Sequence, residues 1–304
     1  MKDKHSTTQL FNFAQDSYLE RTSRPVYALC FLLPFIVFYE LGTLFINSSL
    51  LEKYWQGRVV AFSWMQRFLE YIGFQSKLAW VATPLTVVLI LLALQMASRK
   101  KWSFRWPDIG PMVVECVLLA IPLIVLGLLL NSPAEVGDGL GPAATQTVQV
   151  RAAALPACAW LVDQDTEEVS QQQDRHSTSA SLLADIVTGI GAGIYEELAF
   201  RLILICLLML LFQDVLRFSH SNSIVLSVLL SAALFSAYHH IDFFSGRLYQ
   251  TDPFTWMEFG FRTAAGVYFA VVFAIRGFGI TAGTHAFYDI IATLINAAFF
   301  GGGN

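Results

Sequence analysis

The chain has 304 residues, of which 55% are hydrophobic and only 14% are charged, with a formal net charge of −4. A soluble domain carries roughly 25% charged residues, so this composition excludes an ordinary soluble protein and predicts a polytopic membrane protein. No basic domain is present that would bind nucleic acid. The four cysteines include no CxxC pair, so we expect neither a disulfide framework nor a thiolate metal site.

The first part of the chain divides into a polar arm and three apolar segments. Residues 1–24 lack an early apolar core, so we expect an N-terminal arm and no cleaved signal peptide. Residues 25–130 are expected to hold three transmembrane helices, because each apolar stretch is long enough to cross ~30 Å of hydrocarbon. These stretches lie at about 26–46, 78–98 and 112–130. The aromatic-rich connection 47–77 suits a helix at the membrane interface.

Two loops of opposite charge predict the orientation. The loop after the second span holds the densest basic cluster of the chain, Arg99-Lys100-Lys101 followed by Arg105. The positive-inside rule places this loop, and with it the N-terminus, in the cytoplasm. The long polar loop 131–181 is rich in acidic residues and is expected on the non-cytoplasmic side. We therefore expect a multi-pass integral protein of a bacterial-type cell membrane with a cytoplasmic N-terminus.

Residues 182–300 form the last predicted region. The segment 182–215 is too long for one straight span, so we expect a long kinked helix or two short ones, and seven or eight spans in total. Further spans are expected at about 223–241, 254–275 and 280–300. Gly189 and Gly193 form a small-xxx-small pair, which serves either ordinary helix packing or the placement of Glu196 in a tight core.

Charged residues interrupt this apolar region at Glu196, Glu197 and Arg201. An ionised group at bilayer depth costs at least ~2.5 kcal/mol, so such residues are usually paired or face a wet cavity. Glu197 and Arg201 are four residues apart and share a helix face, which predicts an ion pair. Glu196 is rotated by about 100° from Glu197 and cannot use Arg201 in the same way. Glu197 is therefore predicted to be structural, and Glu196 is predicted to be available for chemistry.

Three more polar groups lie on the following hydrophobic segments. His239 ends one of them, and His285 and Asp289 share a face of the last one because they are four residues apart. A single buried histidine is often only a packing residue. Several costly groups on separate segments of one bundle, however, most economically meet at one site.

These residues form three motifs in a fixed order: Glu196-Glu197-xxx-Arg201, Phe235-xxx-His239 and His285-xxx-Asp289. They resemble the motifs of the CAAX prenyl endopeptidase type II and bacteriocin-processing family, the abortive-infection-like intramembrane proteases. The resemblance covers residues 182–300. It implies an all-α polytopic transmembrane bundle with an intramembrane catalytic cavity, and an endopeptidase that hydrolyses peptide bonds with a glutamate-activated water.

The resemblance also implies a role for each residue. Glu196 corresponds to the general base, and His239 to the group that orients and activates the water. His285 and Asp289 correspond to the pair that stabilises the oxyanion. An ionised Asp289 would repel an oxyanion, so Asp289 is either protonated or serves to orient His285. The supporting residues are Glu197, Arg201 and Phe235. A low-dielectric cavity makes a carboxylate a stronger base than it is in water, which suits this assignment of Glu196.

The expected partners are the lipid bilayer and a peptide or protein substrate with an apolar or lipidated segment, without nucleic acid. No cofactor is implied by the resemblance. A zinc ion held by Glu196, His239 and His285 is the minority alternative, since two histidines and a carboxylate can bind Zn²⁺ with an open position for water. The chain contains no His-Glu-x-x-His helix to support that alternative.

Two other functions compete with the protease. The first is a non-catalytic membrane scaffold or immunity factor that binds peptides or another protease, because a fold does not fix a function. The second is a proton-coupled transporter, suggested by Glu40 and Glu115 within the first and third spans. A transporter of this kind would require pseudo-symmetric halves with broken helices in both, and the sequence shows neither.

Overall fold

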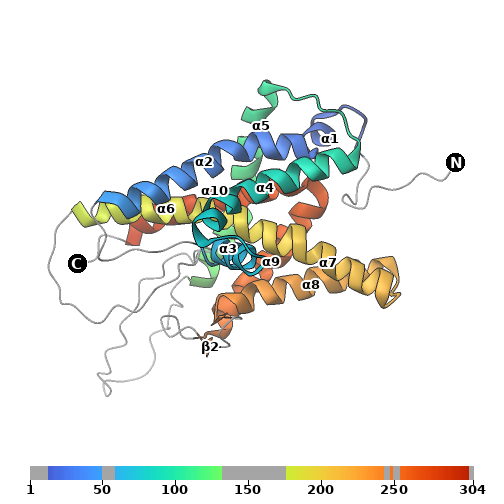
Figure 1. Ribbon diagram of the computed structural model, residues 1–304. Coiled ribbons are helices and arrows are strands. Elements are labelled where there is room, and N and C mark those ends of the chain that lie inside the picture. The colour runs from blue at the N-terminus through green and yellow to red at the C-terminus, as the bar shows by residue number, and fades with distance from the viewer. Residues whose placement is uncertain (1–12, 50–58, 132–175, 243–246, 249–253, 301–304) are drawn as a thin grey trace, which may run out of the picture.

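In the computed structural model, residues 13–49, 59–131, 176–242, 247–248 and 254–300 are described, and they form an almost wholly helical bundle (Figure 1). The long helices are α2 (Pro25–Ser49), α4 (Ser76–Ser98), α5 (Ile109–Asn131), α6 (His176–Glu197), α8 (His220–Tyr238), α9 (Trp256–Arg276) and α10 (Phe278–Ile295). The short elements are α1 (Tyr18–Thr22), α3 (Val60–Tyr71), η1 (Trp106–Asp108) and the strand pair β1 (Ile241–Asp242) and β2 (Arg247–Leu248). The predicted all-α fold class is confirmed.

Seven helical stretches of the described residues are long and apolar enough to cross a membrane. They agree with the predicted spans to within a few residues, apart from the third, which begins six residues earlier at Trp106. Residues 1–12 of the predicted arm 1–24 and residues 132–175 of the predicted loop 131–181 lie outside the described part, so the division into domains stays a prediction. A helix, α3, lies within the predicted segment 47–77, of which residues 50–58 lie outside the described part. The position of α3 at the membrane interface stays a prediction.

The segment Leu182–Val215 is one continuous irregular helix. After α6 it passes through η2 (Leu198–Leu204), α7 (Ile205–Met209) and η3 (Leu210–Val215), and both η2 and η3 are π-helical. At 1.5 Å per residue its 34 residues extend about 50 Å, which exceeds the ~30 Å of a hydrocarbon core. Of the two sequence-based alternatives, the long irregular helix is therefore the one observed, and it gives seven spans.

Helix α10 lies at the centre of the bundle and packs against α6, α5, α2 and α9. Its span is 67% buried, compared with 28% for the span of α4. Small residues allow this close packing. A Cβ atom added at Gly279 would lie 2.7 Å from Ala28 Cα of α2, and one at Gly283 would lie 2.8 Å from Cys116 Sγ of α5. The glycines of α10 thus let two neighbouring helices approach its backbone.

Helix α6 approaches α10 through the glycine pair noted in the sequence. A Cβ added at Gly193 would lie 2.6 Å from Ala286 N, and one at Gly189 would lie 2.7 Å from Asp289 Cβ. Real Cβ atoms do not come this close to neighbouring atoms, so both positions require glycine at this separation of the helices. The pair serves helix packing, and the helix that it packs against carries His285 and Asp289.

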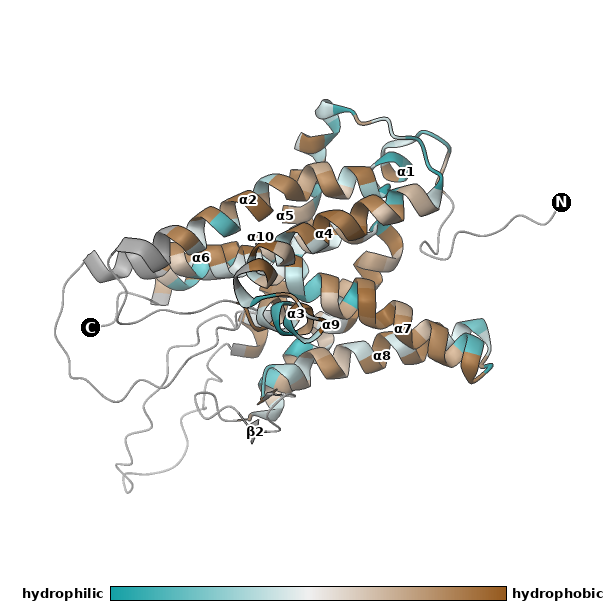
Figure 2. Ribbon diagram, viewed as in Figure 1, coloured by the Kyte–Doolittle hydropathy of each residue, from teal (hydrophilic) through white to brown (hydrophobic). Residues whose placement is uncertain are grey.

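The long helices consist mostly of hydrophobic residues (Figure 2). Exposed large side chains line them, for example Leu85 and Leu89 on α4, Leu118 on α5, and Val225 and Leu229 on α8. Many exposed apolar side chains on long helices mark contact with lipid in a chain of this composition. Together with the seven apolar spans, it supports an integral multi-pass membrane protein.

Charged residues gather at the end of the bundle where α1 lies. Arg276, the last residue of α9, forms an ion pair with Glu115 of α5 and donates to Thr22 Oγ1 at 2.8 Å. The Tyr18 hydroxyl also donates to Glu115 (2.8 Å). Glu115 thus takes part in the polar contacts that join α1, α5 and α9. Glu40, the other acid that suggested a transporter, accepts a hydrogen bond from the Tyr195 hydroxyl (3.2 Å).

Candidate active site

The three motifs meet in the interior of the bundle. α6 ends with Glu196 and Glu197, and η2 carries Arg201 one turn later. His239 caps the end of α8, and α10 supplies His285 and Asp289. The exposed fraction is 0% for Glu196, Glu197, His239 and His285, and 1% for Arg201 and Asp289.

His285 lies among three carboxyl groups. Its Nδ1 atom is 2.7 Å from Glu197 Oε1, and its Nε2 atom is 3.5 Å from Asp289 Oδ2 and 3.9 Å from Glu196 Oε2. The ring stacks on Phe269 of α9, with ring centroids 4.5 Å apart and an interplanar angle of 16°. Because a carboxylate only accepts hydrogen bonds, only a doubly protonated ring can donate on both sides. Through its contact with Glu197, His285 links α10 to α6, and its Nε2 atom lies on the side of Glu196.

The two oxygens of Glu196 have different surroundings. Oε1 accepts a hydrogen bond from the Tyr238 hydroxyl at 3.1 Å. Oε2 is buried and accepts no hydrogen bond from the described part of the chain, and it faces His285 Nε2. One oxygen thus holds the carboxyl group in place, while the other points towards the imidazole.

Glu197 has a different partner, as the helical spacing predicts. Arg201 Nη1 lies 3.1 Å from Glu197 Oε1. The Arg201 guanidinium lies over the Phe235 ring, 4.2 Å from its centroid, and Nη2 donates to Gly266 O at 3.5 Å. A buried ion pair requires such additional contacts to offset the loss of water. Glu197 joins the arginine to His285, and Phe235 supports the arginine.

The contacts described for His239 lie on its own helix. Nδ1 is 2.8 Å from Phe235 O, and the ring meets Tyr238 edge to face with centroids 4.7 Å apart. A carbonyl oxygen only accepts, so Nδ1 is the donor and Nε2 carries the lone pair of the neutral ring. These contacts connect His239 to Glu196 through Tyr238. The catalytic roles assigned to His239 and to the other motif residues stay predictions.

Sequence analysis missed Tyr238 and Phe269. Tyr238 lies three residues after Phe235, so helical spacing places both on one face, and a buried tyrosine hydroxyl needs a partner. That signal was present in the sequence. Trp64 of α3 covers Tyr238 on its other side, with ring centroids 4.9 Å apart. Phe269 lies on a separate helix, α9, and the sequence around it gives no indication of its contact with His285.

A metal site was the minority alternative for this cluster. Within the described residues, no group of three or more His, Cys, Asp or Glu side chains is arranged to hold a metal ion. That the reaction needs no cofactor stays a prediction, and the effect of a chelator on the activity tests it.

Seven apolar spans around a fully buried cluster of carboxyl, imidazole and guanidinium groups define a polytopic membrane protein with an intramembrane polar site. Residues 178–291 match a family model described as type II CAAX prenyl endopeptidase Rce1-like, so this part of the chain is similar to that family. The predicted family is confirmed, and the match includes all three motifs. The family suggests a CAAX-type intramembrane protease with a peptide substrate. No curated protein and no solved structure matches the chain.

Proposed function

We propose that the protein is an intramembrane endopeptidase in which Glu196 activates the attacking water. The observation that carries the proposal is the geometry of Glu196: Tyr238 holds Oε1, and Oε2 faces His285 Nε2 in a fully buried site. A general base must be oriented and must have an oxygen directed towards the reacting groups. Burial also strengthens electrostatic interactions within the site.

The reaction follows from general acid–base chemistry. Glu196 takes a proton from water, and the hydroxide attacks the carbonyl carbon of the peptide bond. The carbonyl oxygen becomes an oxyanion. The tetrahedral intermediate then collapses, the C–N bond breaks, and the proton on Glu196 passes to the leaving amine. The products are a carboxylic acid and an amine, and Glu196 returns to its starting state.

His285 is the proposed oxyanion stabiliser. Glu197 accepts from Nδ1, so the ring is held with Nε2 on the side of Glu196. An Nε2–H group there can donate to the oxyanion and stabilises the charge that develops in the transition state. Asp289, at 3.5 Å from the same nitrogen, is better placed to orient His285 than to bind an anion itself. This supports the second of the two roles considered for Asp289.

His239 is the proposed partner of the attacking water. Its Nδ1 donates to Phe235 O, so Nε2 is the atom that can accept a hydrogen bond from the water and orient it for deprotonation by Glu196. Tyr238 lies between His239 and Glu196 and fixes the position of the carboxyl group. In this proposal Tyr238 is a positioning residue.

The bilayer supplies the substrate in this proposal, as a peptide or protein with an apolar or lipidated segment. The apolar faces of the spans support a substrate that arrives through the membrane. We also propose that the end of the bundle with α1 and the basic loop after α4 faces the cytoplasm, because short cytoplasmic loops carry an excess of Lys and Arg. A bacterial-type cell membrane remains part of the proposal.

The test is cleavage of a quenched peptide library by the purified protein in liposomes. We expect Glu196→Gln to lower the cleavage rate by about 10²–10⁴, the usual contribution of general-base catalysis, with an unchanged thermal unfolding midpoint. Wild-type activity should survive a strong chelator. Loss to the chelator and recovery with Zn²⁺ would instead favour the metal site at Glu196, His239 and His285. Cleavage by Glu196→Gln at the wild-type rate would refute the proposed base.

The scaffold or immunity role makes the opposite prediction. In that case a folded wild type binds peptides without cleaving any of them, and Glu196→Gln binds them equally well. Measuring peptide binding beside cleavage in the same liposomes separates these two functions.

A further inference from the structure

The short connection from α4 to α5 presents a basic and aromatic surface. Arg99, Lys101 and Arg105 are exposed, and Trp102 and Trp106 stand next to two of them in the sequence, with exposed fractions of 57% and 77%. We call these five residues the headgroup patch. The patch directly follows the span that ends at Ser98 and reaches the start of the next span at Trp106. It therefore lies at the level of the membrane interface, where tryptophan side chains concentrate.

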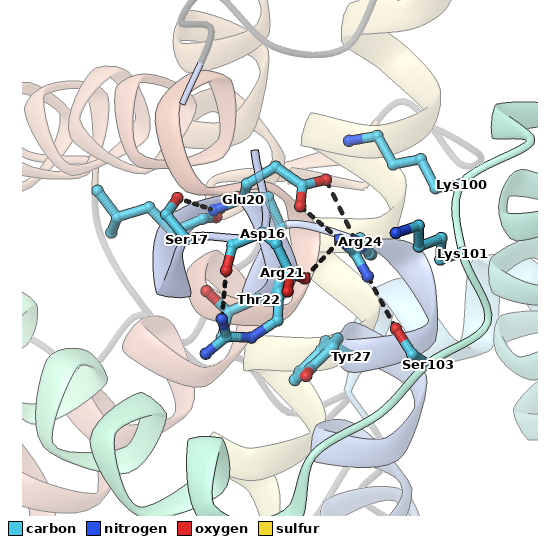
Figure 3. A network of polar contacts seen from close by, with 12 residues as sticks. Asp16, Ser17, Glu20, Arg21, Thr22, Arg24, Tyr27, Lys100, Lys101 and Ser103 are labelled. Atoms are coloured by element: carbon cyan, nitrogen blue, oxygen red, sulfur yellow. Dashed lines mark hydrogen bonds and ion pairs between the residues drawn. The ribbon is translucent and has the colours of Figure 1, made fainter. Parts of the chain in front are cut away.

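The carboxylates near the patch are already engaged by other arginines. Glu20 accepts from Arg24, and Asp108 forms an ion pair with Arg21 at 3.0 Å. Figure 3 shows Glu20 of α1 and Arg24, which follows that helix, beside Lys101 and Ser103 of the loop. Within the described residues, the three basic side chains of the patch form no ion pair. No described carboxylate therefore neutralises them by direct contact.

Contacts from inside the bundle hold the loop backbone in place. Arg24 Nη1 donates to Ser103 Oγ at 3.1 Å, and Gln95 Nε2 donates to Lys100 O at 3.0 Å (Figure 3 shows the first of these). Arg105 N donates to the Tyr27 hydroxyl at 3.1 Å. A loop fixed in this way presents its exposed side chains in a defined arrangement, which lowers the entropy cost of binding.

We propose that the headgroup patch binds the headgroups of anionic phospholipids in the surrounding bilayer. Juxtamembrane basic residues are attracted to an anionic leaflet, with a gain of roughly fivefold in affinity for each Lys or Arg near the surface. The two tryptophans settle at the same depth and place the basic side chains at the phosphate level. This surface is distinct from the buried polar site, so the proposal is independent of the protease activity.

The chain offers a matched pair of substitutions for the test. Arg99 and Arg217 are both exposed and both have a left-handed backbone, with φ of 53° and 58°. Asn tolerates this conformation, so Arg99→Asn and Arg217→Asn remove equal charges at equal backbone cost. Arg217 lies in the loop before α8, away from the two tryptophans in sequence. A triple variant, Arg99→Asn/Lys101→Gln/Arg105→Gln, removes the whole charge of the patch.

The measurement is native mass spectrometry of the purified protein in equal mixtures of phosphatidylglycerol and phosphatidylcholine. We expect the wild type to retain phosphatidylglycerol by about tenfold or more over phosphatidylcholine, Arg99→Asn to lower this preference roughly fivefold, and the triple variant to abolish it. Arg217→Asn, which also follows a span, should lower the preference less than Arg99→Asn does, because neither a tryptophan nor a second Lys or Arg stands beside it. An unchanged preference in the triple variant, or an equal effect of Arg217→Asn, overturns the proposal.

A second measurement needs no charge variant and covers the case in which the triple variant does not fold. Brominated phosphatidylglycerol should quench the tryptophan emission of the wild type more than brominated phosphatidylcholine does. Trp102→Phe/Trp106→Phe should lose this difference. Equal quenching by the two lipids in the wild type would show that the tryptophans rest at the interface without any selection of headgroups.

Discussion

His285 Nδ1 lies 2.7 Å from Glu197 Oε1, and this contact joins two residues that are 88 positions apart in the sequence. It gives Glu197 two tasks, because the same oxygen also lies 3.1 Å from Arg201 Nη1. The carboxylate that sequence analysis treated as purely supportive therefore also fixes which imidazole nitrogen faces Glu196.

Removing the hydroxyl that holds Glu196 should slow catalysis without unfolding the protein. Tyr238→Phe keeps the ring contacts with Trp64 and His239 but loses the donor to Glu196 Oε1. We expect kcat to fall about tenfold or more with KM nearly unchanged, because a hydrogen bond to a charged group contributes about 1.5–3 kcal/mol. Steady-state kinetics in liposomes measures both constants.

The neighbouring tyrosine provides the control for this experiment. Tyr195 is equally buried, but its hydroxyl donates to Glu40 and not to Glu196. Tyr195→Phe should leave kcat close to the wild-type value. If the two substitutions reduced kcat equally, a specific positioning role of Tyr238 would be ruled out.

Breaking the buried ion pair should be costly. Glu197→Gln or Arg201→Met leaves one charged partner without its counterion in the interior, which costs about 3–5 kcal/mol. The double variant should lose less than the sum of the two single losses, because neither charge remains. Denaturant unfolding in mixed micelles measures these free energies.

A partly exposed pair with the same spacing gives the comparison. Arg262 Nη1 and Glu258 Oε2 lie 3.7 Å apart, and 36% of the Glu258 side chain is exposed. Glu258→Gln should therefore lower the free energy of unfolding by less than Glu197→Gln does, because one partner of this pair keeps its contact with water. Equal losses for Glu197→Gln and Glu258→Gln would contradict the assigned importance of burial.

Adding one methyl group between α6 and α10 should damage both stability and activity. The Cβ of Gly193→Ala would lie 2.6 Å from Ala286 N and 2.8 Å from Ala282 O, so backbone atoms of α10 would have to move. Overpacking of this kind costs about 1–3 kcal/mol and would displace His285 relative to Glu196. We expect a lower thermal midpoint and a loss of cleavage activity in the same variant.

Gly260→Ala is the matched control, because a Cβ there meets no atom within 4 Å and the residue lies within α9. This substitution should raise the free energy of unfolding by about 0.5–1 kcal/mol, the helix preference of Ala over Gly. A stabilising effect of Gly193→Ala would show that the two helices are not as closely packed as described.

Acid should weaken the ion pair between Glu20 of α1 and Arg24. The hydrogen bond from Arg24 lowers the pKa of Glu20 below its ordinary value of 4.5. A lowered pKa in the folded state means that the pair stabilises the protein above the unfolded pKa, and that this stabilisation is lost as the pH falls through the folded pKa. The thermal midpoint of the wild type should therefore fall more steeply below pH 4.5 than that of Glu20→Gln. Parallel curves for the two proteins would contradict this coupling.

The sequence by itself determined the features that depend on a single helix. The bilayer thickness sets the length of an apolar span, so six of the seven spans were located to within a few residues. Contacts over four residues, such as Glu197 with Arg201 and His285 with Asp289, follow from the helical repeat alone. The family motifs could be recognised because their residues are costly to bury and stand out in apolar surroundings.

Only the tertiary structure decided how the helices turn towards one another. The contact of Tyr238 with Glu196, the choice of Glu197 as partner of His285 Nδ1, and the stacking of Phe269 on His285 all join separate helices. Each depends on the rotation and shift of one helix against another. Close backbone contacts such as Gly193 against Ala286 set that arrangement. A hydropathy pattern does not contain the arrangement, because the pattern ranks residues by polarity and not by the neighbours that they contact.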